Sequence, residues 1–167
     1  MKVTKPVLGT PEMEEVKKIW MEAFPPEERE MSLDMILSNE RARISAYYDN
    51  ETLVGFIVLI DFDWFDYVSL FAVNSNLRGG GYGGKIWDEV LQEHTTRPMY
   101  FAVEDPDEVP AENTEQRVKR VRFYEKHGCK MTDLEYTLKT RFRLMYYHTP
   151  ERAQEAKDYI ISVLTGK

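Results

Sequence analysis

Residues 78–85 (RGGGYGGK) place five glycines and two cations between an apolar stretch and a segment of helical character. Glycine lets the backbone approach a ligand closely and adopt positive φ, so successive N–H groups can converge on an anion. A helix that starts here would add N–H groups without helical partners and the positive end of its dipole. We therefore predict a phosphate-binding loop, made up of Arg78, Gly79, Gly80, Gly81, Tyr82, Gly83 and Gly84.

Two familiar nucleotide motifs fit these letters incompletely. The pattern G-x-x-x-x-G-K spans 79–85, but a P-loop needs Ser or Thr next as a Mg²⁺ ligand, and Ile86 follows. The dinucleotide pattern G-x-G-x-x-G also matches, and Glu104 lies at a suitable distance for a ribose contact. That pattern needs its first glycine at the end of the strand, whereas residues 74–78 intervene, and only 63 residues follow Glu104. A second mononucleotide half would not fit.

A third pattern, R-x-x-G-x-G, runs from Arg78 to Gly83 after an apolar strand that ends in Ala-Val. It resembles the acetyl-CoA-binding motif of the GNAT superfamily of N-acetyltransferases. Downstream, residues 123–128 (FYEKHG) are similar to the family's F-Y-E-K-x-G signature. Residues 24–29 (FPPEER) are similar to the first helix-to-helix loop of many bacterial members. The resemblance covers roughly residues 3–147.

The resemblance implies a single-domain α+β fold, with a mixed, mostly antiparallel central sheet flanked by helices. The hydrophobic pattern and turn residues predict such elements. We expect strands near 3–8, 44–48, 53–60, 67–73, 99–104, 131–138 and 143–147, and helices from 11 to about 24, then at 31–39, 84–93, 115–127 and 150–164. We assign residues 1–148 to the N-acetyltransferase domain and 149–167 to a C-terminal helix packed on it, whose apolar spacing predicts core or dimer contact.

Composition limits the classes of function. A chain of 167 residues with 43% hydrophobic residues fits one folded domain. A net charge of -7 argues against a general nucleic-acid binder. The single Cys129 excludes an internal disulfide, no cluster of metal ligands is visible, and the apolar run 53–60 is too short to span a bilayer. We expect a cytoplasmic protein, monomeric or homodimeric, that binds neither metal, membrane nor nucleic acid.

The resemblance also implies the chemistry: an uncharged amine attacks the acetyl-CoA thioester directly, without a covalent enzyme intermediate. Backbone groups of Phe71, Ala72 and Val73 would pair with the pantetheine and stabilise the oxyanion. Tyr124 of the F-Y-E-K motif would protonate the departing CoA thiolate, unless it only packs the helix. Glu104 is our first candidate for the general base, although it could instead cap the loop or bind an arginine.

The chain departs from the family pattern at two positions. Where some members carry an acidic base on the fourth strand, this chain has Tyr67, so Asp66 or a chain of water molecules stays an alternative base. Arg117 stands where the family often has an asparagine that contacts pantetheine. That contact is then missing or replaced.

Two acidic stretches, 61–66 and 104–108, could edge a pocket for a cation or simply solvate turns. We therefore predict an acetyl-CoA-dependent N-acetyltransferase that acts on a primary amine, with a small cationic metabolite as the favoured acceptor. The alternatives are a protein or peptide amine as acceptor, and a non-catalytic module that senses acyl-CoA.

Overall fold

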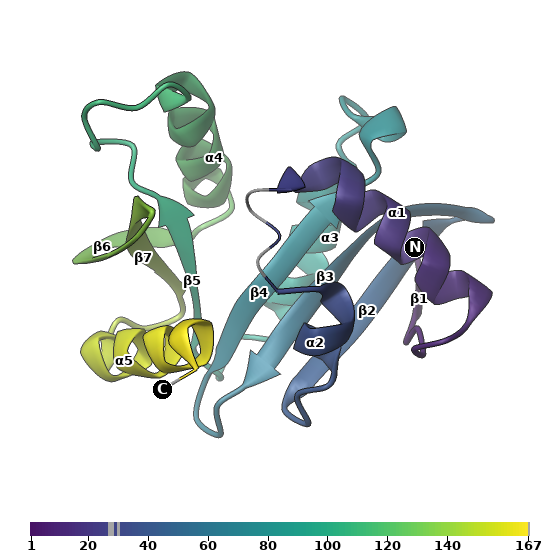
Figure 1. Cartoon of the computed structure of the whole chain (residues 1–167), viewed down its shortest axis with the longest axis horizontal. Coiled ribbons are helices and arrows are strands. Elements are labelled where there is room, and N and C mark those ends of the chain that lie inside the picture. Colours follow the sequence, from purple (N-terminus) through teal and green to yellow (C-terminus); the bar gives the residue numbers. More distant parts are fainter. Residues whose placement is uncertain (27–28, 30, 167) are drawn as a thin grey trace. The chain divides into compact units, whose positions relative to one another are not determined.

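The computed structural model describes residues 1–26, 29 and 31–166, and its helices and strands follow the expected α+β order (Figure 1). The elements are β1 (Lys2–Thr4), α1 (Pro11–Ala23), α2 (Leu33–Leu37), β2 (Ala42–Asp49), β3 (Thr52–Asp61), β4 (Asp66–Val73), a 3₁₀ turn η2 (Ser75–Leu77), α3 (Tyr82–Gln92), β5 (Met99–Glu104), α4 (Thr114–Lys126), β6 (Lys130–Leu138), β7 (Thr140–Tyr147) and α5 (Ala153–Thr165).

The seven strands hydrogen-bond in the order β1-β2-β3-β4-β5-β7-β6. The pairs β1–β2, β2–β3, β5–β7 and β6–β7 are antiparallel. The pair β4–β5 is parallel, with Asp66 opposite Met99 and Tyr67 opposite Tyr100. This confirms the predicted mixed, mostly antiparallel sheet.

The chain divides into two compact units, which are described separately. The first comprises Met1–Asp61 with Val68–Glu89, and the second comprises Phe62–Tyr67 with Val90–Lys167. The predicted division at residue 148 stays a prediction. None of the helices in the described residues is long and apolar enough to cross a membrane.

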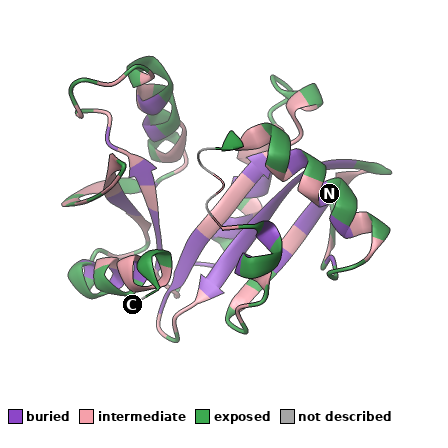
Figure 2. Cartoon of the chain, in the orientation of Figure 1, coloured by how far each residue is buried: buried purple, intermediate pink, exposed green. Residues whose placement is uncertain are grey.

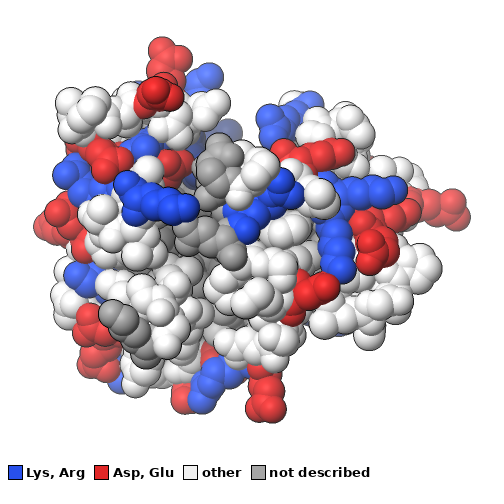
Figure 3. Space-filling view, viewed as in Figure 1, with Lys and Arg blue, Asp and Glu red and all other residues white. Residues whose placement is uncertain are grey.

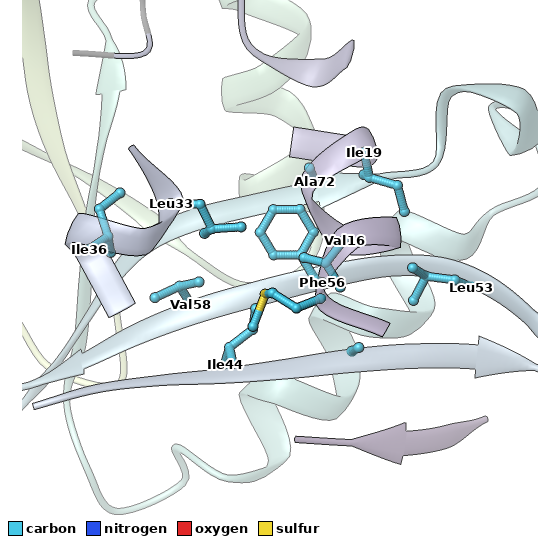
Figure 4. Packing of buried hydrophobic residues seen from close by; sticks show 11 residues of the cluster. Val16, Ile19, Leu33, Ile36, Ile44, Leu53, Phe56, Val58 and Ala72 are labelled. Carbon is cyan, nitrogen blue, oxygen red and sulfur yellow. The ribbon is translucent and has the colours of Figure 1, made fainter. Parts of the chain in front are cut away.

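In the first unit, β3 is buried along almost its whole length, from Leu53 to Ile60 (Figure 2). Such a continuous apolar run is expected for a strand covered on both faces. Side chains of α1 and α2 pack with those of β2 and β3, among them Val16, Leu33 and Phe56 (Figure 4). The fully buried Ile86 and Trp87 belong to α3. The sheet from which β4 leads to the glycine loop is therefore well packed.

Local signals explain where the helices of this unit begin. Thr10 caps α1 by accepting a hydrogen bond from the Met13 backbone N–H, and Pro11 occupies the first helical position. Ser32 caps α2 in the same way through the Met35 N–H. Helix α2 is shorter than predicted, and β1 ends at Thr4 rather than near residue 8.

The second unit has its own core. Phe65, Met99, Tyr100, Leu144 and Met145 are fully buried. The apolar spacing of α5 predicted core or dimer contact for Ala153, Ala156, Ile160 and Val163; the first three are buried and Val163 is partly buried. This favours core packing for that helix, while its part in any dimer stays untested.

Candidate acetyl-CoA and catalytic site

In the first unit, Asn74 fixes the start of the glycine loop just after β4. Its backbone N–H donates to the Val54 carbonyl at 2.8 Å, and its side-chain Nδ2 donates to the Leu53 carbonyl at 3.1 Å. Its Oδ1 accepts from the Asn76 N–H at 3.0 Å, which starts the 3₁₀ turn Ser75–Leu77. The loop is therefore anchored on the buried strand β3.

Two glycines give the loop its shape. Gly79 and Gly81 have φ of 87° and 76°, in the left-handed region where a side chain is strained. A Cβ built on either one meets no atom within 4 Å, so the space beside the backbone is open. Both glycines are exposed. This is the geometry that a backbone needs in order to receive an anion.

Helix α3 begins at Tyr82, two residues earlier than the sequence predicted. Its 11 residues make it long enough for a useful N-terminal dipole, and the Lys85 N–H donates to the Gly81 carbonyl at 3.2 Å. Tyr82, Gly83 and Gly84 therefore form the first turn, whose N–H groups are the ones that helices leave for an outside acceptor. Lys85 is exposed, and its ammonium lies 5.2 Å from the centre of the Tyr82 ring.

The backbone of Phe71, Ala72 and Val73 forms the end of β4 and is packed closely from one side by Gly55 of β3. A Cβ at Gly55 would lie 2.7 Å from the Ala72 carbonyl oxygen and 2.7 Å from the Ile86 Cδ1. No role was predicted for Gly55. The sequence feature that could have revealed it is a glycine inside an otherwise apolar strand, because such a glycine often marks a close approach of another backbone.

A cavity of about 570 Å³ lies beside the loop in the first unit. It is open, and no ligand chemistry was predicted for it. Its lining comes from the N-terminal strand, the β2–β3 turn and the start of α3: Met1, Lys2, Tyr48, Asp49, Asn50, Tyr82 and Lys85.

In the second unit, Tyr124 lies near the end of α4 and is partly buried. Its ring contacts those of Phe101 and Phe123, with centroids 4.6 and 5.2 Å away. Burial raises the pKa of Tyr124 to about 12, although the positive charge of Arg120 opposes this shift. The phenol therefore keeps its proton at neutral pH and is able to donate it.

Glu104 ends β5, as predicted, and its carboxylate is held by arginines. Oε2 lies 3.1 Å from an Arg117 guanidinium nitrogen, and Oε1 lies 3.7 Å from Arg120. The Asn113 amide also donates to Oε1 at 3.3 Å. The structure thus shows the arginine partner that the sequence left as an alternative to a catalytic role, and it does not test the catalytic role.

Arg117 occupies the position that departs from the family pattern, and its side chain is only 4% exposed. Besides Glu104 it donates to Glu108 at 2.8 Å, to the Asp105 carbonyl at 3.1 Å and to Asn113 at 2.8 Å. The hydrogen bond from Arg117 is the main reason that the pKa of Glu108 is lowered. Arg117 therefore ties together the connection between β5 and α4.

The acidic stretch 104–108 is largely neutralised in this way. Asp105 is buried and pairs with Arg141 at 2.7 Å, and Asp107 pairs with Arg143 at 3.2 Å. On the face seen in Figure 3, acidic and basic side chains are interspersed. These contacts favour the interpretation that the stretch stabilises a loop.

Asp66, the alternative base, is fully buried within the second unit. One carboxylate oxygen lies 2.8 Å from His94 Nε2, and the other accepts from Arg97 at 3.0 Å. The His94 Nδ1 lies 2.7 Å from the Val90 carbonyl oxygen. Asp66 is therefore engaged in a buried polar cluster, in which the contacts of His94 and Arg97 were not predicted.

Two further predictions from the sequence concern metal binding and the stretch 24–29. Within the residues that the structure describes, no group of three or more His, Cys, Asp or Glu side chains is arranged to hold a metal ion. The stretch 24–29, which supported the resemblance, falls partly outside the described residues, at positions 27 and 28.

Comparisons with known proteins agree with this geometry. The sequence profile of the acetyltransferase (GNAT) family matches residues 13–129. The inferred acetyltransferase YjbC of Bacillus subtilis (strain 168) is 32% identical over 110 residues, which are 65% of this chain and 53% of that protein. The chain thus spans about half the length of this curated relative.

Solved structures show the same fold. An inferred GNAT-family acetyltransferase from Bacteroides thetaiotaomicron has a TM-score of 0.79 and 26% identity, and the match covers 99% of this chain and 98% of that one. A GNAT-family acetyltransferase from Elizabethkingia anophelis with acetyl-CoA bound has a TM-score of 0.63 and 14% identity, over 89% of this chain and 97% of that one.

Proposed function

The chain belongs to the acetyltransferase (GNAT) family, and we propose that it transfers the acetyl group of acetyl-CoA to a primary amine of a small cationic metabolite. The observation that carries this proposal is the glycine loop, with Gly79 and Gly81 at positive φ and open space beside them. Helix α3 starts within the same loop. Together they offer converging backbone N–H groups to a pyrophosphate.

The backbone at the end of β4 has the second role in this proposal. The N–H and C=O groups of Phe71, Ala72 and Val73 would pair with the extended pantetheine as a neighbouring strand does. An N–H group there would also stabilise the negative charge that develops on the thioester oxygen. Gly55 keeps this stretch of β4 close to β3 and α3.

Two proton transfers complete the reaction. Glu104 would accept a proton from the acceptor ammonium, directly or through water, so that the free amine attacks the thioester carbon. As the carbon–sulfur bond breaks, Tyr124 would donate its proton to the CoA thiolate, and the extra proton that the new amide nitrogen loses would restore the Tyr124 phenol. The raised pKa keeps the phenol protonated but also makes it a weaker acid, so a direct hydrogen bond to the thiolate would have to assist the transfer.

A small cationic amine is favoured by the net charge of -7 and by the acidic stretch 61–66, in which Asp63 is exposed. A protein or peptide amine stays the alternative acceptor. The cytoplasmic location, the monomeric or homodimeric state and the packing of residues 149–167 on the domain also stay predictions.

A second candidate is a module that binds acyl-CoA without turnover. The observation that favours it is the pairing of Glu104 with Arg117, because a carboxylate that contacts a buried guanidinium is already occupied by a partner within the protein. In that case the glycine loop would bind CoA and Tyr124 would have only a packing role.

One experiment separates the two candidates. We would measure free thiol released from acetyl-CoA in the presence of a panel of polyamines, amino sugars, amino acid derivatives and short peptides, and CoA binding by calorimetry. An enzyme is expected to release thiol with at least one amine class. Binding without release across the panel would favour the sensor, and absence of CoA binding would overturn both.

A further inference from the structure

Tyr82, within the glycine loop, makes a hydrogen bond that leaves the loop. Its hydroxyl donates to Asp49 Oδ2 at 2.5 Å. This bond to a carboxylate is the first cause of the raised pKa of Tyr82. Both residues belong to the first unit and line its cavity. The bond joins the start of α3 to a part of the sheet that is remote in sequence.

Asp49 is well fixed on its side of this bond. It is the last residue of β2 and lies opposite Thr52 of β3. Asn50 follows in the left-handed region with φ of 56°, as expected in a tight turn between paired strands. Strand β2 is paired on both sides, with β1 and with β3. The backbone at Asp49 is therefore held in the sheet, which fixes the position from which its carboxylate accepts the hydrogen bond.

The loop, by contrast, has little to restrain it between the Asn74 anchor and the first turn of α3. Glycine loses more backbone freedom on ordering than any other residue, and residues 79–84 contain five glycines. Of these six residues, only Tyr82 has a side chain that can hold the loop from outside. A loop ordered beforehand binds its ligand more tightly, since less entropy is lost on binding.

The charge of Asp49 makes the arrangement informative. A carboxylate near a proposed pyrophosphate site would by itself repel the ligand. Here the carboxylate is satisfied by the Tyr82 hydroxyl, and Lys85 lies over the same ring. A carboxylate at position 49 is therefore best explained by the position that its hydrogen bond gives to Tyr82.

We propose that Asp49 is a positioning residue for cofactor binding, which holds the glycine loop through Tyr82 in the conformation that receives the CoA pyrophosphate. This rests on the proposed function, because it assumes that the loop binds CoA. It assigns a role to a residue outside both sequence motifs.

The test compares Tyr82→Phe, Asp49→Ala, Asp49→Asn and the double variant Tyr82→Phe/Asp49→Ala. Loss of a hydrogen bond to a charged group should weaken CoA binding about tenfold, measured by calorimetry. Asp49→Asn keeps an acceptor oxygen and should bind nearly as the parent does. The double variant should bind no worse than either single one, because both remove the same bond. If turnover is found, the KM for acetyl-CoA should rise with kcat nearly unchanged.

Thr4→Val is the matched control. The Thr4 hydroxyl donates to Glu12 Oε2 at 2.7 Å, so this change also removes a hydroxyl–carboxylate hydrogen bond in the same unit, and Thr4 belongs neither to the loop nor to the lining of the cavity. It should lower the melting temperature about as much as Tyr82→Phe does and leave CoA affinity at the parent value.

The outcomes are distinguishable. If the parent does not bind CoA, the proposed function fails before the positioning role is tested. If the parent binds and Asp49→Ala binds equally or more tightly, the positioning role is wrong. Weaker binding by Tyr82→Phe alone would also overturn it, since the hydroxyl would then act on the ligand itself.

Discussion

The glycine loop of the first unit and the β5–α4 connection of the second differ in whether their polar groups leave room for a ligand or are paired within the protein. The loop keeps open space beside Gly79 and Gly81. The connection fills its surroundings with arginine, so that Glu104, Asp105 and Glu108 each contact a guanidinium. Because polar groups near a protein interior are normally satisfied, a region that leaves room is better suited to an external ligand. The difference indicates that binding is the clearer function of the first region and structural support that of the second.

The most severe test of this comparison is Gly81→Val. The substitution forces a β-branched residue to adopt a φ of 76° and fills the open space beside the loop. Loss of two or more hydrogen bonds to a phosphate should weaken CoA binding about 10³-fold. The measurement is calorimetric titration with CoA, together with the thermal shift that CoA produces.

Gly9→Val provides the control for backbone strain. Gly9 has a φ of 83° and open space as well, but it lies before α1 and outside the loop. It should cost similar stability and keep CoA affinity. Equal CoA affinity in Gly81→Val and the parent would remove the loop from the site.

The next largest effect is expected in the second unit. Tyr124→Phe should lower kcat about 10²-fold and leave the affinity for acetyl-CoA nearly intact, because the hydroxyl acts only on the leaving sulfur. Steady-state kinetics with thiol detection, once an acceptor is known, gives both numbers. If turnover is unchanged, Tyr124 only packs against Phe101 and Phe123. The second unit would then support structure at this residue too, which would sharpen its difference from the glycine loop.

A smaller effect decides whether the arginine-rich connection also works in catalysis. Glu104→Gln should reduce kcat/KM about tenfold at neutral pH, less than is usual for a general base, because water can carry the proton instead. The loss should shrink as the pH rises and the acceptor amine deprotonates unaided. The measurement is a pH profile of kcat/KM for both proteins.

Arg117→Gln is the companion variant. It removes the buried guanidinium and should destabilise the protein by about 3 kcal/mol, since it leaves its carboxylate partners uncompensated. Glu104 would still be present to accept a proton, so kcat/KM at neutral pH should fall less than it does in Glu104→Gln. A profile altered in the same way by both variants would mean that Glu104 acts only through Arg117.

The smallest effect concerns stability at alkaline pH. Burial raises the pKa of Tyr67, Tyr100 and Tyr124 in the second unit, and of Tyr48 in the first, to about 12 each. Tyrosine in an unfolded chain titrates near pH 10. Between about pH 10 and 12 the unfolded chain has therefore lost protons that the folded protein keeps, so the free energy of unfolding falls as pH rises.

Chemical denaturation at a series of pH values measures this decline. Tyr124→Phe should make it shallower by on the order of 1 kcal/mol over the range. Because three of these four tyrosines lie in the second unit, hydrogen exchange should show that its amides lose protection first. An equal loss in both units would mean that the buried tyrosines do not set the pH dependence.

The sequence predicted the fold and the position of the glycine loop before a helix well, because both depend on local chemistry. Glycine spacing and the start of a helix are written in consecutive residues, and the order of apolar strands and helices followed from periodicity. The start of α3 was misplaced by two residues because glycines at 83 and 84 suggested a loop.

Contacts between distant segments could not be predicted. Arg117 was noticed as a departure, but its partners at 104, 105 and 108 depend on how α4 returns to β5. His94 gave no functional signal, because its carboxylate partner lies 28 residues earlier in the chain. The bond from Tyr82 to Asp49 is equally non-local. Catalytic roles in the second unit depend on such contacts, and so they stay predictions.

Gly55 limits how the glycine loop could be transferred to another protein. The Ala72 carbonyl and the Ile86 side chain occupy the space where a Cβ at position 55 would lie. The binding element is therefore discontinuous: it consists of the loop and of a gap in a strand that precedes it. A designer who grafted residues 71–85 onto another sheet would have to graft the gap too. Without it, even a perfect copy of the motif would be displaced from its strand.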